Sequence, residues 1–289
     1  MTAPRLSLFI LLPLLAMLGA CASTHTSEES VALAPVPLAL DVNNFRGGVT
    51  VRVDASRTDA LVRSSVWVEA DTPRSEIASI MDAVDINVSL EDHGGRAVLR
   101  VVTASAADVE WEHRVDLVVE LPRCDGIRVR TEGGHIVAID TDGSTTLENR
   151  GGGIDFRTSH PVDEPMTLTA VDGSIFAAAP LTSRGVVDLE TLEGKVKFKD
   201  FGAGVDEAYA SVRNFSGTIN QGSNPIVCRT NDGDIWLRLD DDPIAYVPPL
   251  GWWYPRDVEG QFFLGGSYRW TRNLPDDDLP EPIEIDYPY

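Results

Sequence analysis

The chain has 289 residues and carries 45 acidic side chains against 24 lysines and arginines, which gives a formal net charge of −21. A surface of this sign repels nucleic acid and anionic lipid headgroups, so we expect no nucleic-acid partner. The charge could attract divalent cations or basic partners. We favour a simpler role, in which it keeps a long β surface soluble and its strand edges unpaired.

Residues 1–20 have the form of a signal peptide, because Arg5 precedes an apolar run that is too short for a membrane-spanning helix. The run ends in Leu18-Gly-Ala-Cys21, which closely resembles the lipobox of bacterial lipoproteins. The resemblance implies that Cys21 becomes the acylated N-terminus, and two or three acyl chains would anchor the protein stably in a membrane. Ala22 after the cysteine implies the outer membrane, with the surface or periplasmic face left open. The alternative is an ordinary secretory peptide in which Cys21 is incidental.

After Cys21 the chain is rich in Ser, Thr, Glu, Ala and Pro up to residue 37. Such a composition buries little apolar surface. We therefore predict a flexible tether over residues 21–37, which lets the folded domain stand away from the bilayer.

One pattern recurs six times between residues 127 and 239. Each copy has a branched apolar anchor, namely Ile136, Ile154, Ile175, Val196, Ile219 and Ile235. Two residues earlier stands a glycine, namely Gly134, Gly152, Gly173, Gly194, Gly217 and Gly233. Five residues earlier is a small, mostly polar residue, namely Thr131, Asn149, Ala170, Thr191, Asn214 and Thr230. Seven residues earlier is an apolar residue, namely Val129, Leu147, Leu168, Leu189, Val212 and Cys228.

The spacing within each copy predicts a strand, a tight corner at the glycine, and a second strand. Alternate residues of a strand point to one face, and glycine permits the sharp turn. Because copies follow one another every 16 to 23 residues, we predict an all-β repeat, a β-solenoid or β-helix-like fold with rungs of about 20 residues. The corner Asn and Thr side chains should hydrogen-bond to backbone or to the next rung. The alternative is a β-sandwich or β-roll of consecutive hairpins.

An earlier full copy begins at Leu40 and reaches its anchor at Val49, with Gly47 two residues before the anchor. A weaker copy is suggested between Val88 and Ala97. The intervening sequence predicts strands near residues 61–70 and 111–121 and a short helix near residues 72–84.

These features resemble the bacterial putative-adhesin family of β-strand repeats, a domain of unknown function. The resemblance rests on the opening Leu40-Asp-Val-Asn-Asn-Phe-Arg-Gly-Gly-Val, on the strand Val115–Leu121 with Pro122, and on the corners Asp172-Gly-Ser-Ile and Asp232-Gly-Asp-Ile. It covers residues 38–239 and implies a β-solenoid-like fold at the cell envelope. It brings no family active site to carry over.

The tail at residues 240–289 is acidic and aromatic. Its aromatic residues suggest an interaction patch, which comprises Trp252, Trp253, Tyr254 and Trp270. The alternative, which we prefer, is a cap over the last rung, because a repeat fold must cover its open end.

Cys124 and Cys228 lie near opposite ends of the repeat block. If each copy is one rung, about five rungs at roughly 4.8 Å separate them, whereas a disulfide needs Cα atoms within about 7 Å. We therefore predict two unpaired cysteines, with Cys228 as a small core residue.

The sequence gives only weak signals for catalysis. Asp155, Asp172, Asp188 and Glu190 could face outward as in glycan-cleaving β-helices, but acidic residues occur along the whole chain. No G-x-S-x-G or H-E-x-x-H motif occurs and the histidines lack metal-ligand spacing, so we expect no metal and no cofactor. Asp-rich turns faintly resemble calcium loops, and calcium binding is left open.

We therefore predict an envelope-anchored lipoprotein with a non-catalytic ectodomain for adhesion or for interaction with a protein or glycan. A periplasmic envelope scaffold or sensor is the alternative, and a glycan-active β-helix enzyme is a distant third.

Overall fold

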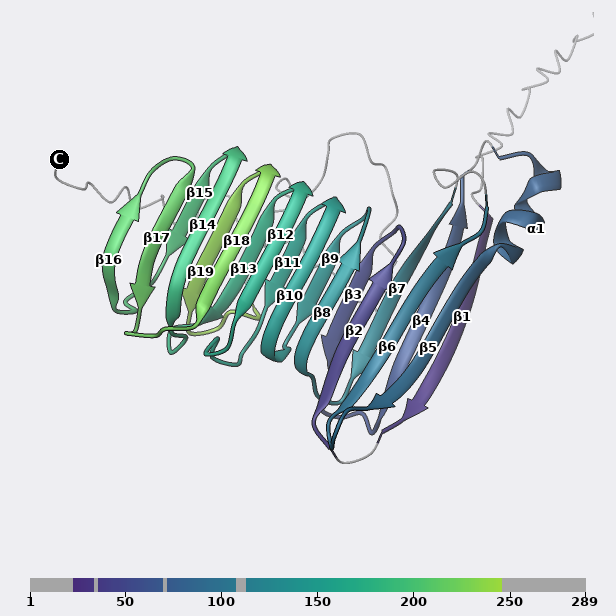
Figure 1. Cartoon of the computed structure of the whole chain (residues 1–289), viewed down its shortest axis with the longest axis horizontal. Coiled ribbons are helices and arrows are strands. Elements are labelled where there is room, and N and C mark those ends of the chain that lie inside the picture. The colour runs from purple at the N-terminus through teal and green to yellow at the C-terminus, as the bar shows by residue number, and fades with distance from the viewer. Residues whose placement is uncertain (1–22, 34–35, 70–71, 108–112, 246–289) are drawn as a thin grey trace, which may run out of the picture. The chain divides into compact units, whose positions relative to one another are not determined.

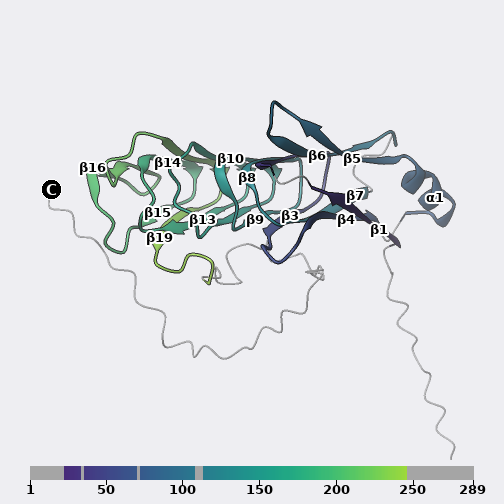
Figure 2. The same ribbon diagram turned by 90° about the horizontal axis from the view of Figure 1, so that it is seen from below.

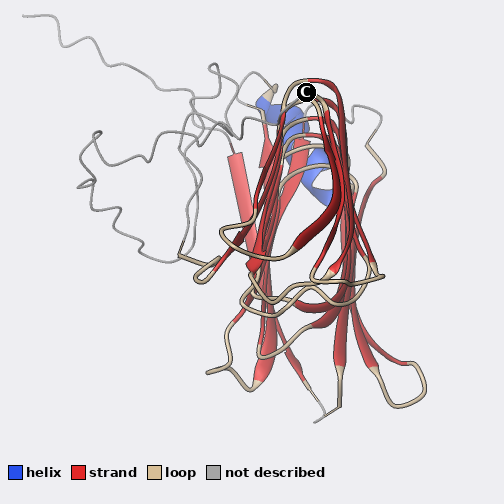
Figure 3. Ribbon diagram, turned by 90° about the vertical axis from the view of Figure 1, so that its left-hand side faces the viewer, coloured by secondary structure: helices blue, strands red, loops and turns tan. Residues whose placement is uncertain are grey.

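A computed structural model describes residues 23–245 except 34–35, 70–71 and 108–112. All of these belong to one compact unit. The predicted signal peptide, Cys21 and the predicted aromatic patch of the tail lie outside the described residues. The described chain is all-β, as predicted, and consists of two large sheets and one short helix, α1 (Arg74–Asp82). The sheets lie face to face as two layers (Figures 2 and 3).

The first layer, sheet A, has nine strands. In spatial order these are β1 (Ser23–Ala32), β4 (Asp59–Val68), β7 (His113–Leu121), β3 (Val49–Val53), β9 (Ile136–Ile139), β11 (Ile154–Arg157), β13 (Ile175–Pro180), β19 (Ile235–Asp240) and β15 (Val196–Lys199) (Figure 1).

The second layer, sheet B, has ten strands. In spatial order these are β16 (Val205–Ala210), β17 (Asn214–Ile219), β14 (Gly185–Glu193), β18 (Pro225–Asp232), β12 (Met166–Asp172), β10 (Asp142–Gly151), β8 (Asp125–Thr131), β2 (Leu38–Asn44), β6 (Ala97–Ser105) and β5 (Val84–Asp92).

The repeat pattern of the sequence sets the register of both sheets. In sheet A the anchors are direct neighbours in parallel strands, in the order Val49, Ile136, Ile154, Ile175, Ile235 and Val196. In sheet B the residues seven before them are neighbours too, in the order Val42, Val129, Leu147, Leu168, Cys228 and Leu189. Each of these copies therefore contributes one strand to each sheet and turns at its glycine. Their inward side chains form the core between the layers.

The spatial order of the copies differs from their order in the chain. The last copy, β18 and β19, lies between the copy of β12–β13 and that of β14–β15, with parallel pairing on both sides. Spacing along the sequence could not reveal this insertion, because every copy presents the same register to its neighbours.

The prediction of a repeat copy around Ile219 is wrong, because this segment does not contribute one parallel strand to each sheet. Strands β16 and β17 form an antiparallel hairpin that pairs with β14 at the end of sheet B. Gly217 lies inside β17 rather than at a corner, and Val212 is 67% exposed rather than buried. The spacing matched because β17 also alternates, with Phe215 and Ile219 turned inward. Phe215 stacks on Phe198 at a ring-centroid distance of 4.2 Å and closes the core at this end.

At the other end, the weaker copy suggested near Ala97 is wrong because β5 and β6 form an antiparallel hairpin. A pair of parallel-paired strands that the sequence did not reveal, β6 and β7, lies there instead. Leu99 and Val101 of β6 flank Leu40 and Val42, and Leu117 of β7 flanks Val49. This strand pair has no glycine corner between its two strands, which explains why the spacing pattern did not reveal it.

The structure corrects the prediction of a flexible tether over residues 21–37. Strand β1 fills most of that segment and pairs antiparallel with β4 over ten residues. Low apolar content argues against burial but not against strand pairing, because backbone hydrogen bonds to an open sheet edge require no apolar side chain. Polar contacts add to the pairing: Ser27 Oγ lies 2.7 Å from Ser64 Oγ, and Arg63 Nε donates to Glu28 at 2.7 Å. The predicted strands near residues 61–70 and 111–121 and the helix near residues 72–84 correspond to β4, β7 and α1.

The predicted hydrogen bonds at the corners are present. Each corner side chain donates to a glycine carbonyl at 2.8 Å: Thr131 to that of Gly47, Asn149 to that of Gly134, Thr230 to that of Gly173 and Thr191 to that of Gly233. Every one joins a corner side chain to the glycine of the neighbouring copy. The side chains are buried, and a buried hydrogen bond of this kind contributes about 1 kcal/mol. Ala170 occupies the same position between Asn149 and Thr230 but has no side-chain donor.

The corner glycines approach their neighbours too closely for a side chain. Gly152 has φ +143°, and a Cβ there would lie 1.8 Å from the carbonyl oxygen of Gly134. A Cβ would meet backbone atoms at 2.2 Å at Gly47, 2.4 Å at Gly134, 2.3 Å at Gly173, 2.1 Å at Gly194 and 2.5 Å at Gly233. Gly217 differs, since the nearest atom would be 3.4 Å away.

We expect Gly152→Ala to lower the free energy of unfolding by more than about 2 kcal/mol, because it combines backbone strain with a backbone clash. Gly217→Ala is the matched control and should change stability by less than about 1 kcal/mol, since its site accepts a methyl group. Urea denaturation of both variants measures the difference. Equal losses would refute the claim that only one of these glycines forms a corner.

Ala170 lies between Asn149 and Thr230 in sheet B. By the register of the other corners, a Thr hydroxyl at this position should donate to the carbonyl of Gly152. We therefore expect Ala170→Thr to stabilise the protein by about 1 kcal/mol and to raise the Tm by about 2–4 °C. Ala170→Val has nearly the same shape without the hydroxyl. An equal gain in that variant would mean that packing, not the hydrogen bond, is responsible.

Candidate interaction surface

Residues 23–245, apart from the three short gaps, hold no group of three or more His, Cys, Asp or Glu side chains suited to a metal ion. In the same residues, no helix has the length and apolar character to cross a membrane.

Three of the four carboxylates considered for catalysis are paired with arginines. Asp188 and Glu190 lie on the outer face of sheet B, where Arg229 donates to Asp188 at 3.0 Å and lies 3.3 Å from Glu190. Asp155 lies on the outer face of sheet A, 3.0 Å from Arg157. Burial raises the pKa of Asp155, and Arg157 opposes that shift. Asp172 ends β12 at an exposed corner.

Exposed apolar side chains gather where β14 to β17 end the sheets. Of the seven large exposed apolar residues in the described chain, five fall between residues 186 and 212. They are Val186, Leu192, Phe201, Tyr209 and Val212. Leu192 and Val212 are 56% and 67% exposed, which is unusual for apolar side chains.

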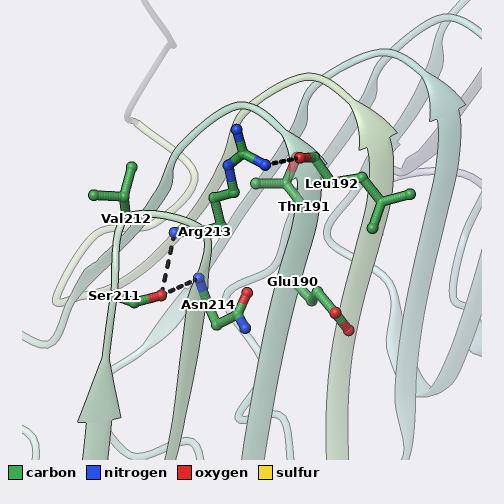
Figure 4. A pocket seen from close by; sticks show the side chains of 7 residues that line it. All are labelled: Glu190, Thr191, Leu192, Ser211, Val212, Arg213 and Asn214. Atoms are coloured by element: carbon green, nitrogen blue, oxygen red, sulfur yellow. Dashed lines mark hydrogen bonds between the residues drawn. The ribbon is translucent and has the colours of Figure 1, made fainter.

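Leu192 and Val212 share an open depression of about 500 Å³. We call it the terminal depression, and Figure 4 shows its lining. The lining residues are Glu190, Thr191, Leu192, Ser211, Val212, Arg213 and Asn214.

Hydrogen bonds connect the residues that line the terminal depression. Ser211 Oγ accepts hydrogen bonds from the backbone N–H groups of Arg213 and Asn214, at 3.3 and 3.0 Å. Arg213 Nη1 donates to the carbonyl of Leu192 at 2.7 Å, and Thr191 N–H donates to the carbonyl of Arg213 at 3.0 Å. The site thus offers two apolar side chains in a fixed frame with a cation and an anion nearby, an arrangement suited to binding.

Beside the terminal depression, β16 is the edge strand of sheet B. The edge is irregular: its pairing with β17 shifts register between Asp206 and Tyr209, and Glu207 has φ +54°. Irregular, acidic edges discourage the addition of another strand. A partner at this end would therefore bind through side chains.

A basic strand on the opposite sheet was missed by the sequence analysis. The three lysines of the chain are Lys195, Lys197 and Lys199, all at or in β15. The signal was available, because alternate lysines in a chain of net charge −21 occur nowhere else. Lys197 and Lys199 Nζ each lie 5.6 Å from the ring centroid of Trp236.

The two cysteines of the described chain are free and buried. Burial raises the pKa of each thiol to about 12. The predicted separation was wrong in detail, since β18 lies three strands from β8 rather than five. Three spacings of about 4.8 Å still give roughly 14 Å, which is too far for a disulfide.

Comparisons with known proteins show a shared fold. The sequence matches no protein-family model and no curated protein. A crystal structure named as a putative cell adhesion protein from Clostridium sporogenes is 10% identical, with TM-score 0.52, over 75% of this chain and 100% of that chain. A second structure, named as a putative adhesin from Bacteroides fragilis, is 8% identical over 74% of this chain and 97% of that chain. Its TM-score of 0.27 is too low to carry an argument. The chain therefore shares its fold with a bacterial protein named for cell adhesion.

We expect neither Cys124 nor Cys228 to react with a thiol reagent until the protein unfolds. At pH 8 a thiol of pKa about 12 is ionised in only about one molecule in 10⁴, and burial blocks access. Labelling in increasing urea, in a chain carrying Cys21→Ser, should follow the unfolding transition. Val212→Cys, at an exposed position, should label at once and serves as the positive control. Rapid labelling of the native protein without that substitution would contradict the buried placement.

Proposed function

We propose that this protein is a lipid-anchored bacterial envelope protein whose β-repeat domain binds a protein or glycan and has no catalytic activity. The observation that carries the proposal is the terminal depression, where Leu192 and Val212 are exposed among hydrogen-bonded residues. Exposed apolar side chains that cluster in this way are typical of interaction sites.

The repeat block is, in this proposal, a β-solenoid. Support comes from the parallel neighbours in both sheets, which keep one register through six copies. A sandwich of consecutive hairpins would pair neighbouring strands antiparallel. In the described chain, antiparallel pairs occur only at the two ends of the block.

The proposed anchor is Cys21, on the strength of the lipobox-like sequence before it. Strand β1 begins at Ser23, two residues later, so an acylated Cys21 would hold this edge of sheet A close to the bilayer. Strand β1 is the first strand of sheet A and β15 the last. The terminal depression would then lie at the end of the sheets farthest from the membrane, where a partner can reach it.

A periplasmic scaffold or sensor is the second candidate, and β1 is the observation that favours it. Without a tether, the domain extends from the membrane only as far as its own sheets do. Such a reach suits a partner within the envelope better than a distant surface.

One experiment in intact cells tests both the binding site and the location. A photo-crosslinking residue is placed at position 212, in the terminal depression, and at position 90 as the control. Leu90 is also an exposed apolar residue, but it lies on β5 at the other end of sheet B. The same cells are treated with protease before and after lysis. We expect a crosslinked partner from position 212 alone, and loss of membrane attachment in Cys21→Ser cells.

Each result decides one part of the proposal. Cleavage on intact cells supports adhesion, whereas protection until lysis supports the scaffold or sensor. Equal crosslinking from positions 212 and 90 would refute the terminal depression as the binding site. A Cys21→Ser protein that still fractionates with membranes would refute the lipid anchor.

A further inference from the structure

The outer face of sheet A carries a small apolar cluster of its own. Ile175, Ala177 and Ile235 point into the core, so Phe176, Ala178 and Trp236 point outward, and these three residues form a cluster separate from the main core. We call them the apolar outer patch. The rings of Phe176 and Trp236 meet edge to face at a centroid distance of 5.9 Å.

The apolar outer patch is buried although it lies on an outer face. Phe176 and Ala178 are 0% exposed and Trp236 is 8% exposed. Neighbouring strands shield such side chains from the sides, but burial this complete requires a further layer above the sheet.

Cations surround the apolar outer patch on two sides. Lys197 lies in register with Phe176 and Trp236. Arg238 and Lys199 lie in register with Ala178. The guanidinium of Arg238 lies 4.4 Å from the ring centroid of Phe201. Burial lowers the pKa of Lys199, and the nearby Arg238 and Lys197 lower it further. Aromatic faces are the neutral partners that such crowded cations prefer.

The chain itself returns over this face after β19. Arg157 on β11 donates to the carbonyl of Ile244 at 3.3 Å, and Pro243 is buried. Since β11 and β19 are separated by β13, the segment from Asp241 to Ala245 must cross from β19 towards β11. Figure 2 shows this segment on the outer side of the sheet A layer. The last described residues therefore lie beside the apolar outer patch.

Residues 246–253 have the composition that fits this place. They read Tyr-Val-Pro-Pro-Leu-Gly-Trp-Trp, with no charged side chain and two adjacent tryptophans. From Ile244 to Trp252 the chain can span up to about 26 Å. Recrossing from β11 to β15 requires three strand spacings, or roughly 14 Å. The reach is therefore sufficient.

We propose that residues 246–253 lie across the outer face of sheet A, with Trp252 and Trp253 packed on the apolar outer patch. Lys197, Lys199 and Arg238 then line the tryptophan faces. This interaction differs from both roles that the sequence suggested for these tryptophans, because they neither cap the last rung nor remain available to an external partner. It does not depend on the lipid anchor or on the terminal depression.

Disulfide trapping tests the proposal in the full-length chain carrying Cys21→Ser. Ala178→Cys places a thiol in the apolar outer patch, and Gly251→Cys places one beside the tryptophans without removing them. The matched control pairs Gly251→Cys with Thr169→Cys, on the outer face of sheet B. We expect a disulfide within one chain for the first pair, at low protein concentration, and at least about tenfold less for the control.

A second variant separates the tryptophans from the rest of the tail. Trp252→Ser with Trp253→Ser should reduce trapping by about tenfold, whereas Trp270→Ser should leave it unchanged. Disulfide-linked dimers in place of the intramolecular product would assign the cover to a second copy and overturn the proposal. Equal trapping by the control pair, or none by either pair, would overturn it as well. Circular dichroism before oxidation confirms that each variant is folded.

Discussion

The close approach of neighbouring corners is the constraint on which the structure depends. The carbonyl of Gly134 lies where a Cβ of Gly152 would stand, and the same crowding recurs at Gly47, Gly173, Gly194 and Gly233. Glycine therefore allows neighbouring copies to pair at strand spacing, and the adjacent Thr or Asn side chain then reaches the carbonyl of the neighbouring glycine. Register follows from this contact, because a shift of one residue would turn every core side chain outward.

Local rules account for what the sequence could predict. Alternation, glycine position and corner donors all act within about ten residues, so they identified the strands, the corners and the inward set that includes Leu168 and Ile175. The same rules do not predict which copies become neighbours in the sheets. Every copy presents the same edge, so nothing in the pattern tells that β18 inserts between β12 and β14. The pattern also predicted a corner at Gly217, because the spacing fits there. The structure leaves space for a side chain at this position, so glycine is not required.

Missed features share one physical cause, which is that they do not repeat. The strand pair of β6 and β7 has no glycine corner, and β1 has little apolar content because backbone pairing and polar contacts hold it to β4. In both places the chain closes an end of the sheets, where the neighbours differ from those inside the block. Composition alone could have identified one such place, since the three lysines of the chain all fall between residues 195 and 199.

The two outer faces of the sheets differ in a way that bears on function. Sheet B carries ion pairs such as Arg130 with Glu148 and Arg229 with Asp188, which are solvated and contribute little stability individually. Sheet A near β13 and β19 carries a buried apolar cluster framed by cations. On a surface that is mostly polar and charged, an apolar cluster requires a specific cover or a specific partner. The residues that depart from the repeat, Leu192 and Val212 at one end and Phe176 and Trp236 on one face, supply the apolar surface on which the two proposals rest.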